Sequence, residues 1–392
     1  MNKISIVYTG HSLSEIRRVV FFKSILSSKY CTALFTNIGI KLPFLGDILF
    51  EIKIFVKLLD KDTKVIHLND LSVVFPFIIK IFKKFGKIVI FDTGNIHSEI
   101  LEVTHHSKII VSTAKLAEKI AIINSDIIIS RGIYLAEVIE GIRRKHDGIF
   151  YLPDPVDVDM LSVISPLKAR QFVKLPDQLY LIGYVSNFVF IKVFGKIMPR
   201  GWELIEIIYN FKQNNIFDVK VIFIGTGPAL KELRKLAEDR KVEDLCIFTG
   251  KVSETDLANN LKAIDIGFME DYDNFAYRTS IGSKVQEYMA AGKLVITGKG
   301  PERLRLLLGG QGSDYLFDAP NTEMYNGIDN YLKELWRLFL HAFLNKDENY
   351  FKGKKNEQQA KILFDKHIVE ENLLKIYKNL KFERILENEL DH

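Results

Sequence analysis

Short apolar segments alternate with longer helix-like segments along most of this chain. In its first part the apolar segments span residues 4–8, 65–68, 88–91, 127–129 and 149–152. Each has the length of a strand, and the segments between them show the apolar spacing of helices. Repeated strand–helix units favour a parallel sheet covered by helices on both faces, so this part predicts a doubly wound α/β domain.

The alternation is interrupted at Pro153-Asp154-Pro155 and starts again near residue 179. New strand candidates follow at residues 179–185, 219–224, 246–248, 264–268 and 294–297, and the chain beyond residue 326 is typical of helix. We therefore expect an α/β protein with Rossmann-like domains at residues 1–175 and 176–355, followed by a C-terminal helix at residues 356–392. Ligands of such sheets bind at the carboxyl ends of strands, and the cleft between the domains is the expected site.

Composition excludes several classes of protein. A chain of 392 residues, 47% of them hydrophobic, can bury two large cores. The net charge of +5 is small and the lysines are scattered, so no nucleic-acid partner is expected. The two cysteines, Cys31 and Cys246, lie in separate apolar strand candidates and are predicted to be core thiols. Without a recognisable leader or a run of eighteen apolar residues, the expected location is the cytoplasm.

Two segments, residues 44–59 and 71–87, are unusually apolar and also carry lysines. A helix that rests on an anionic membrane surface needs this combination, so peripheral contact at the inner face of a membrane is one interpretation. A core helix that covers a parallel sheet is the other. We favour the core helix, because Pro76 interrupts the second segment and helices on such sheets are commonly this apolar.

The segment SIGSKVQEYMAAGKLVITGKG, residues 280–300, carries the clearest functional pattern. A short turn precedes a helix start and consists of Ser280, Ile281, Gly282 and Ser283. Unpaired amides and the positive dipole end of a helix favour an anion there, and Lys284 adds a charge. Glu287 follows three residues later on the same helix face, where a ribose hydroxyl would suit it. The alternative is a solvated lysine–glutamate pair.

Five blocks in sequence order resemble one enzyme family. They read IGYVSN, RGWELIEII, VKVIFIGTGPALKELRKLAE, IFTGKVSETDLANNLKAIDIGF and SKVQEYMAAGKLVITG, beginning at residues 182, 200, 219, 247 and 283. This order resembles the retaining nucleotide-sugar glycosyltransferases of family four, whose GT-B fold has two facing Rossmann-like domains. The resemblance implies an acceptor-side N-terminal domain, a donor-binding C-terminal domain and a last helix that packs back on the N-terminal domain.

The resemblance implies roles for several residues. Arg200 stands where a basic residue neutralises the donor diphosphate, with Lys192 and Lys196 as weaker candidates. Lys284 is expected to share this catalytic task. The remaining donor-binding residues implied are the turn at 280–283, Glu287, and the loop residues Gly10, Gly227, Lys251 and Val252.

The sequence departs from the family pattern at two positions. Thr279 stands where a first glutamate is usual, and acids at residues 270, 271 and 273 are candidates to replace it. In the N-terminal domain, Asp92 is the third predicted catalytic residue, but Gly94 occupies the place of a histidine. His97 lies two residues late, and we do not expect His105 and His106 to bind a metal.

Transfer in this family is pictured as a front-side replacement, in which the departing diphosphate takes the acceptor proton. We therefore expect a hexosyltransferase without a metal or other cofactor, with a nucleotide-diphosphate sugar as co-substrate. Its acceptor is expected to be a glycan or lipid-linked molecule. A noncatalytic GT-B-like binding protein and a sugar-nucleotide epimerase of the same fold are the alternatives.

Overall fold

The computed structural model describes residues 3–8, 13–36, 45–69, 75–103, 107–321 and 327–380. The chain divides into two compact units, Met1–Pro155 with Lys366–His392, and Val156–Asp365. Each unit is an α/β domain built on a parallel sheet, so the predicted fold class is confirmed. The predicted loop around Gly10 and the pair His105 and His106 lie outside the described residues.

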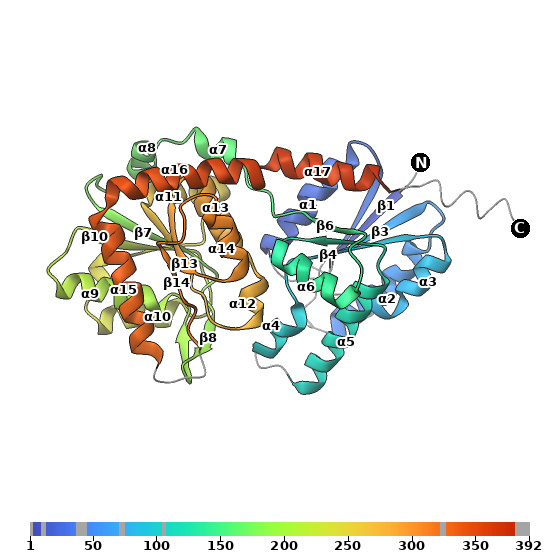
Figure 1. Ribbon diagram of the computed structural model, residues 1–392, viewed down its shortest axis with the longest axis horizontal. Helices are drawn as coiled ribbons and strands as arrows, with labels where there is room; N and C mark the ends of the chain where they lie inside the picture. Colours follow the sequence, from blue (N-terminus) through green and yellow to red (C-terminus); the bar gives the residue numbers. More distant parts are fainter. Residues whose placement is uncertain are drawn as a thin grey trace, which may run out of the picture. The chain divides into compact units, whose positions relative to one another are not determined.

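In the described part of the N-terminal unit, six parallel strands form a sheet in the order β2-β1-β3-β4-β5-β6 (Figure 1). The strands are β1 (Lys3–Tyr8), β2 (Cys31–Thr36), β3 (Thr63–Asn69), β4 (Ile88–Thr93), β5 (Ile127–Ser130) and β6 (Ile149–Tyr151). The helices are α1 (Leu13–Ser27), α2 (Leu45–Leu58), α3 (Phe75–Lys84), α4 (His97–Val103), α5 (Lys108–Asn124), α6 (Ile133–Arg143) and α17 (Lys366–Lys378).

The last helix completes the core of the N-terminal unit. Val369, Leu373 and Tyr377 of α17 are fully buried in the same cluster as Val19 and Phe22 of α1. The connections from β2 to β3, from β3 to β4 and from β4 to β5 all run towards β6, whereas the connection from β1 to β2 runs the other way. Because parallel connections are right-handed, α2, α3 and α5 lie together on the face opposite α1. The helices α1 and α17 therefore cover one face, and α2, α3 and α5 cover the other.

In the described part of the C-terminal unit, a second six-stranded parallel sheet has the order β11-β10-β7-β12-β13-β14, beside a hairpin of β8 and β9. The strands are β7 (Tyr180–Val185), β8 (Phe190–Val193), β9 (Lys196–Pro199), β10 (Val219–Ile224), β11 (Cys246–Gly250), β12 (Ile266–Phe268), β13 (Leu294–Gly298) and β14 (Leu316–Phe317). The helices are α7 (Val158–Ser162), α8 (Pro166–Phe172), α9 (Trp202–Gln213), α10 (Leu230–Asp239), α11 (Glu254–Ala263), α12 (Phe275–Thr279), α13 (Ser283–Ala290), α14 (Pro301–Leu308), α15 (Ile328–Leu344) and α16 (Lys346–Leu363), with a short 3-10 helix at Glu243–Leu245.

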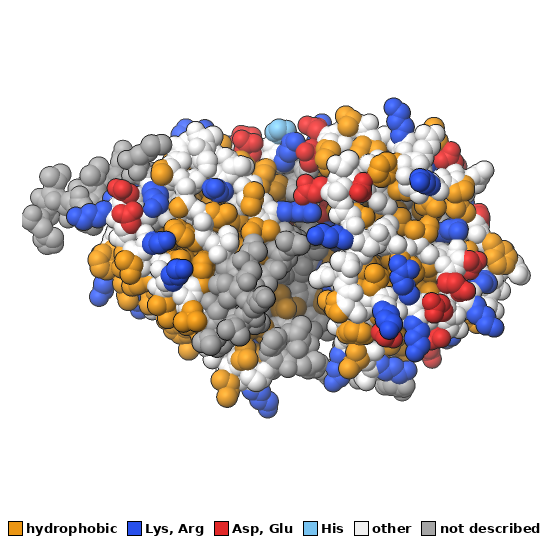
Figure 2. All heavy atoms as spheres, turned by 180° about the vertical axis from the view of Figure 1, so that it is seen from behind, with side chains coloured by type: hydrophobic (Ala, Val, Ile, Leu, Met, Phe, Trp, Pro, Cys, Tyr) orange, Lys and Arg blue, Asp and Glu red, His pale blue; other side chains and the backbone are white. Residues whose placement is uncertain are grey.

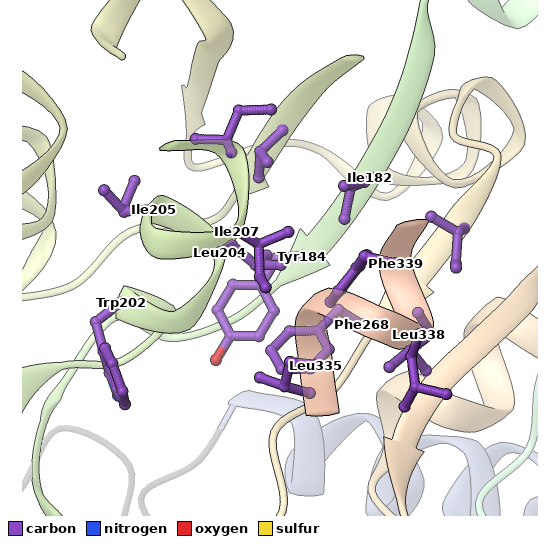
Figure 3. Packing of buried hydrophobic residues seen from close by; sticks show 14 of the residues in the cluster. Ile182, Tyr184, Trp202, Leu204, Ile205, Ile207, Phe268, Leu335, Leu338 and Phe339 are labelled. Atoms are coloured by element: carbon purple, nitrogen blue, oxygen red, sulfur yellow. The ribbon is translucent and has the colours of Figure 1, made fainter. Parts of the chain in front are cut away.

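The core of the C-terminal unit is apolar and rich in aromatic side chains. Figure 3 shows Tyr184 of β7 and Phe268 of β12 between the apolar faces of α9 and α15. The rings of Phe211 and Trp336 meet edge to face, 4.8 Å apart, where these two helices pack together. Burial of this many large side chains gives the carboxyl edge of the sheet a rigid support.

The unit boundaries fall at residues 155/156 and 365/366, whereas the sequence suggested 175/176 and 355/356. The first difference arises because α8 packs on the C-terminal unit: the buried Arg170 donates hydrogen bonds to the carbonyl of Ala263 and to Asp265. The second arises because α16 continues across β13 before the chain turns at Phe364, whose carbonyl accepts from the amide of Val156.

Two expectations about single elements need correction. The loop predicted after the first strand of the second domain contains the β8–β9 hairpin, whose turn residues Phe194 and Gly195 both have positive φ. Cys31 is exposed rather than a core thiol, because β2 is an edge strand.

No helix within the described ranges is both long and apolar enough to cross a membrane.

Candidate active site

The turn before α13 is fixed by a buried arginine. Arg303 of α14 donates to the carbonyl oxygens of Ser280 and Tyr277 at 2.8 and 2.9 Å. Gly282 has a φ of 74°, and a Cβ there would lie 2.3 Å from the side chain of Met269. Only glycine fits this position without strain. The first turn of α13 is therefore held at the carboxyl end of β12.

Lys284 and Glu287 form a pair on one face of α13, as their spacing predicted. The Nζ atom of Lys284 lies 3.2 and 3.1 Å from the two carboxylate oxygens of Glu287. The two side chains are 27% and 18% exposed, so the pair is half-buried and still open to a ligand. Of the turn residues, Ile281 is buried and Ser283 is half-buried.

Arg200 follows the β8–β9 hairpin and reaches the carboxyl end of β12. Its Nε atom lies 2.7 Å from Oε1 of Glu270, and one of its Nη atoms donates to the hydroxyl of Tyr277 at 3.0 Å. The other Nη atom makes no hydrogen bond within the described residues. Burial would lower the pKa of Arg200, but Glu270 raises it well above its usual value. The guanidinium therefore stays charged and keeps one donor group for a ligand.

A second buried carboxyl group, Glu203, lies near this ion pair and was missed by sequence reasoning. Tyr272 donates its hydroxyl proton to Glu203, whose side chain is fully buried at the start of α9. Burial, and then the negative charge of Glu270, raise the pKa of Glu203 to about 8. The only signal in the sequence was its spacing of four residues from Ile207, on the buried face of α9.

The acids considered as replacements for the missing glutamate have different partners. Asp271 is buried and pairs with Arg303, whereas Asp273 pairs with Arg278 at the surface. Only Glu270 contacts Arg200. Thr279 itself is fully buried, and its hydroxyl donates to the carbonyl of Phe275 at 3.1 Å.

The other predicted donor-binding residues of this unit lie at the ends of β10 and β11. The amide of Gly225 donates to the carbonyl of Gly250 at 3.1 Å and joins the two loops. A Cβ on Gly227 would lie 2.2 Å from the carbonyl oxygen of Phe188, so the glycine permits close backbone packing. Lys251 is exposed and Val252 is half-buried at the same edge of the sheet. Lys192 and Lys196 are exposed on the β8–β9 hairpin.

In the N-terminal unit, Asp92 is the centre of a buried polar cluster at the ends of β3 and β4. Arg18 donates to both of its carboxylate oxygens at 2.9 and 3.2 Å, and Asn69 donates to Oδ2 at 3.0 Å. Burial alone would raise the pKa of Asp92, but the Arg18 charge, the contact with His67 and the Arg131 charge together lower it. Asp92 is fully buried, so this geometry makes it a residue that fixes the sheet edge, and its catalytic role stays a prediction.

The side chain of Arg131 packs against Gly94, the position at which the resemblance implies a histidine. A Cβ on Gly94 would lie 2.8 Å from Cδ of Arg131, so a larger residue at position 94 would displace that arginine. His97 is half-buried at the start of α4. Searching the described ranges finds no group of three His, Cys, Asp or Glu side chains placed to hold a metal ion.

Residues 202–335 match the family of glycosyl transferases group 1. Among curated protein sequences, none is significantly similar to this chain.

Several solved structures share the fold of the chain at low sequence identity. HepE of Anabaena, in complex with UDP and glucose, is 15% identical with a TM-score of 0.68, over 97% of this chain and 100% of that one. Sucrose-phosphate synthase of Thermosynechococcus elongatus is 13% identical with a TM-score of 0.71, over 97% and 99%. A glycosyltransferase of Rickettsia africae is 14% identical with a TM-score of 0.67, over 99% of both chains.

The family match covers most of the candidate site. It includes Glu270 and the Lys284–Glu287 pair on α13, and it begins at Trp202, just after Arg200. The fold likeness extends over both units. Residues 202–335 therefore form a glycosyl transferases group 1 domain, and the chain is a glycosyltransferase with two Rossmann-like domains of the GT-B type.

Proposed function

We propose that the protein moves a sugar from a nucleotide-diphosphate donor to a glycan or lipid-linked acceptor, with retention of anomeric configuration. The observation that carries the proposal is the half-buried Lys284–Glu287 pair on the first turns of α13. A helix N-terminus with an adjacent cation suits a diphosphate, and a carboxylate one turn later suits ribose hydroxyls. One donor molecule would satisfy both groups.

Arg200 supplies the second cation of the proposed donor site. Its charge is balanced by Glu270, and its remaining Nη group is available for a diphosphate oxygen. A charge-assisted hydrogen bond contributes about 1.5–3 kcal/mol, so each cation is worth roughly a factor of 10 to 150. Gly227, Lys251 and Val252 lie at the same sheet edge, where the base of the nucleotide would rest.

The proposed chemistry needs no side-chain nucleophile. The bond between the anomeric carbon and the diphosphate oxygen breaks while the acceptor oxygen bonds to the same face of that carbon. The departing diphosphate accepts the acceptor's proton, and Arg200 and Lys284 stabilise the negative charge that develops on it. Glu270 keeps Arg200 in place through the ion pair.

A uridine diphosphate sugar is the first donor to test, because HepE has been solved with UDP and with UDP-glucose. Purified protein would be mixed with UDP-, GDP- and ADP-sugars, and binding measured by calorimetry and turnover by nucleotide release. We expect Glu287→Ala and Arg200→Ala each to weaken donor binding or turnover at least roughly tenfold. Glu238→Ala and Arg240→Ala, which replace exposed residues of α10 and its end, serve as matched controls.

The outcome also separates the alternatives. Consumption of the donor without an acceptor, with a new sugar nucleotide as product, would identify an epimerase. Donor binding without turnover on any glycan or lipid-linked acceptor would identify a binding protein. If no donor binds and both variants behave like wild type, the proposal is wrong.

A further inference from the structure

Helices α2 and α3 carry apolar side chains on both of their faces. Their inner faces cover the sheet with Ile54, Leu58, Ile79 and Phe82, as expected for core helices. Their outer faces carry large apolar residues that are 39–74% exposed, namely Leu49, Ile52, Val56, Phe77, Ile81 and, just beyond the end of α3, Phe85. An outer face of this kind is unusual, because solvent-exposed helix faces are normally polar.

The two apolar stripes point in the same direction. Both helices cover the same face of the sheet, and both stripes lie opposite the side chains that contact it. The rings of Phe55 and Phe82 meet 5.6 Å apart between the helices, and Glu51 accepts a hydrogen bond from the amide of Phe75. The outer stripes of α2 and α3 therefore form one continuous surface, which we call the α2–α3 face.

Four exposed lysines interrupt this apolar surface, namely Lys53, Lys57, Lys80 and Lys84. None of them forms an ion pair with a carboxylate of the described residues. The acid of α2 whose side chain is described, Glu51, is fully buried, and α3 contains no acid. Figure 2 shows hydrophobic side chains with lysines among them on the surface of the N-terminal unit. The described side chains of the α2–α3 face are therefore apolar or cationic.

We propose that the α2–α3 face rests on a membrane surface that contains anionic lipids. The long lysine side chains bring their charges to the level of the lipid headgroups, while the large apolar side chains enter the boundary between headgroups and acyl chains. A protein partner or a second copy would bury the same apolar residues, but a copy would oppose lysine to lysine. The charge pattern favours lipid. This inference is independent of the proposed transfer reaction and places the N-terminal unit at a membrane without a spanning helix.

The test is flotation of the full-length protein with vesicles of phosphatidylcholine alone, and with vesicles that also contain phosphatidylglycerol. We expect binding only to the anionic vesicles, and loss of binding when salt rises from about 0.1 M to about 1 M, which shortens the Debye length from ~10 to ~3 Å. Lys53→Glu with Lys80→Glu should weaken binding at least roughly 25-fold, since each lysine near an anionic surface contributes roughly a factor of five.

Matched variants separate charge from apolar insertion. Ile52→Ser with Phe77→Ser should weaken binding although all lysines remain. The controls are Lys333→Glu with Lys355→Glu, and Leu344→Ser with Phe351→Ser, which change similarly exposed residues of the C-terminal unit. Thermal unfolding should be unchanged in all four double variants, because every replaced side chain is exposed.

Equal binding to neutral and anionic vesicles, or no binding to either, would overturn the proposal. A dimer by light scattering that Ile52→Ser with Phe77→Ser dissociates, without vesicle binding, would instead assign the face to a second copy of this chain. Loss of vesicle binding in the two double variants of the α2–α3 face, with donor turnover equal to that of wild type, would support the inference, whatever the outcome for the transfer reaction.

Discussion

At the scale of single residues, Glu203 is the most testable group in the C-terminal unit. Its pKa of about 8 lies above the ordinary value of 4.5, so the folded protein holds it protonated where the unfolded chain ionises it. Stability is therefore lost as pH rises from about 4.5 towards 8, by up to roughly 5 kcal/mol. We expect Glu203→Gln, which retains the acceptor for Tyr272, to unfold at a higher temperature than wild type above pH 7 and equally near pH 4.

Thermal unfolding of both proteins across this pH range measures the effect. Glu238→Gln, an exposed replacement in α10, is the control and should follow wild type at every pH. A constant difference between Glu203→Gln and wild type, independent of pH, would contradict the assigned protonation.

Thr279 shows why the missing family glutamate cannot simply be restored. The side chain is fully buried and bonded to the carbonyl of Phe275. Thr279→Glu would bury a carboxylate without a partner, so we expect it to destabilise the protein by about 2 kcal/mol or more and not to raise turnover. Urea unfolding and nucleotide release measure the two effects. Thr279→Ser, which keeps the hydroxyl, is the control, and higher turnover in Thr279→Glu would refute this reading.

Sequence reasoning named the segments that carry the candidate site residues but could not predict which of those residues pair. The i to i+3 spacing was enough to put Lys284 and Glu287 on one helix face. The ion pair between Arg200 and Glu270 joins residues seventy positions apart, and no local pattern predicts such a contact. The burial of Asp92 by Arg18 was missed for the same reason.

At the scale of elements, a buried polar contact joins α17 to the N-terminal sheet. The hydroxyl of Tyr377 lies 2.6 Å from Nδ1 of His67, whose Nε2 lies 3.4 Å from Asp92. Tyr377→Phe leaves the buried ring nitrogen of His67 unsatisfied and should cost about 1–3 kcal/mol. Hydrogen exchange of the α17 amides should accelerate accordingly. Tyr350→Phe, on the exposed side of α16, is the control and should leave that exchange unchanged. Unchanged exchange in Tyr377→Phe would contradict the role given to this contact.

Elements with a strong local pattern were predicted well, and those set by tertiary contacts were not. The strand predicted at residues 219–224 agrees with β10, and the helix start predicted after the turn at residues 280–283 agrees with α13. The single C-terminal helix predicted at residues 356–392 is instead divided between α16 and α17, because Phe364 is buried and the next residue pairs with Val156. The lysine- and glutamate-rich sequence of this stretch carries no sign of that break.

At the scale of the whole molecule, the alternation of strands and helices was sufficient to predict two Rossmann-like domains. The order of five motifs was sufficient to predict the glycosyltransferase family of the second. Neither pattern identifies the sugar, the base or the acceptor, because these depend on side chains that meet only in the folded chain and on a donor loop that differs from the family at Thr279.

The central claim is that the first turns of α13 hold the diphosphate and ribose of a donor. A crystal structure of the protein with its nucleotide-sugar donor tests it most directly. We predict a diphosphate oxygen within hydrogen-bonding distance of Lys284 Nζ and of an Arg200 Nη, with a ribose hydroxyl donating to Glu287. A donor bound elsewhere, with the Lys284–Glu287 pair unchanged and in contact only with solvent, would contradict the claim.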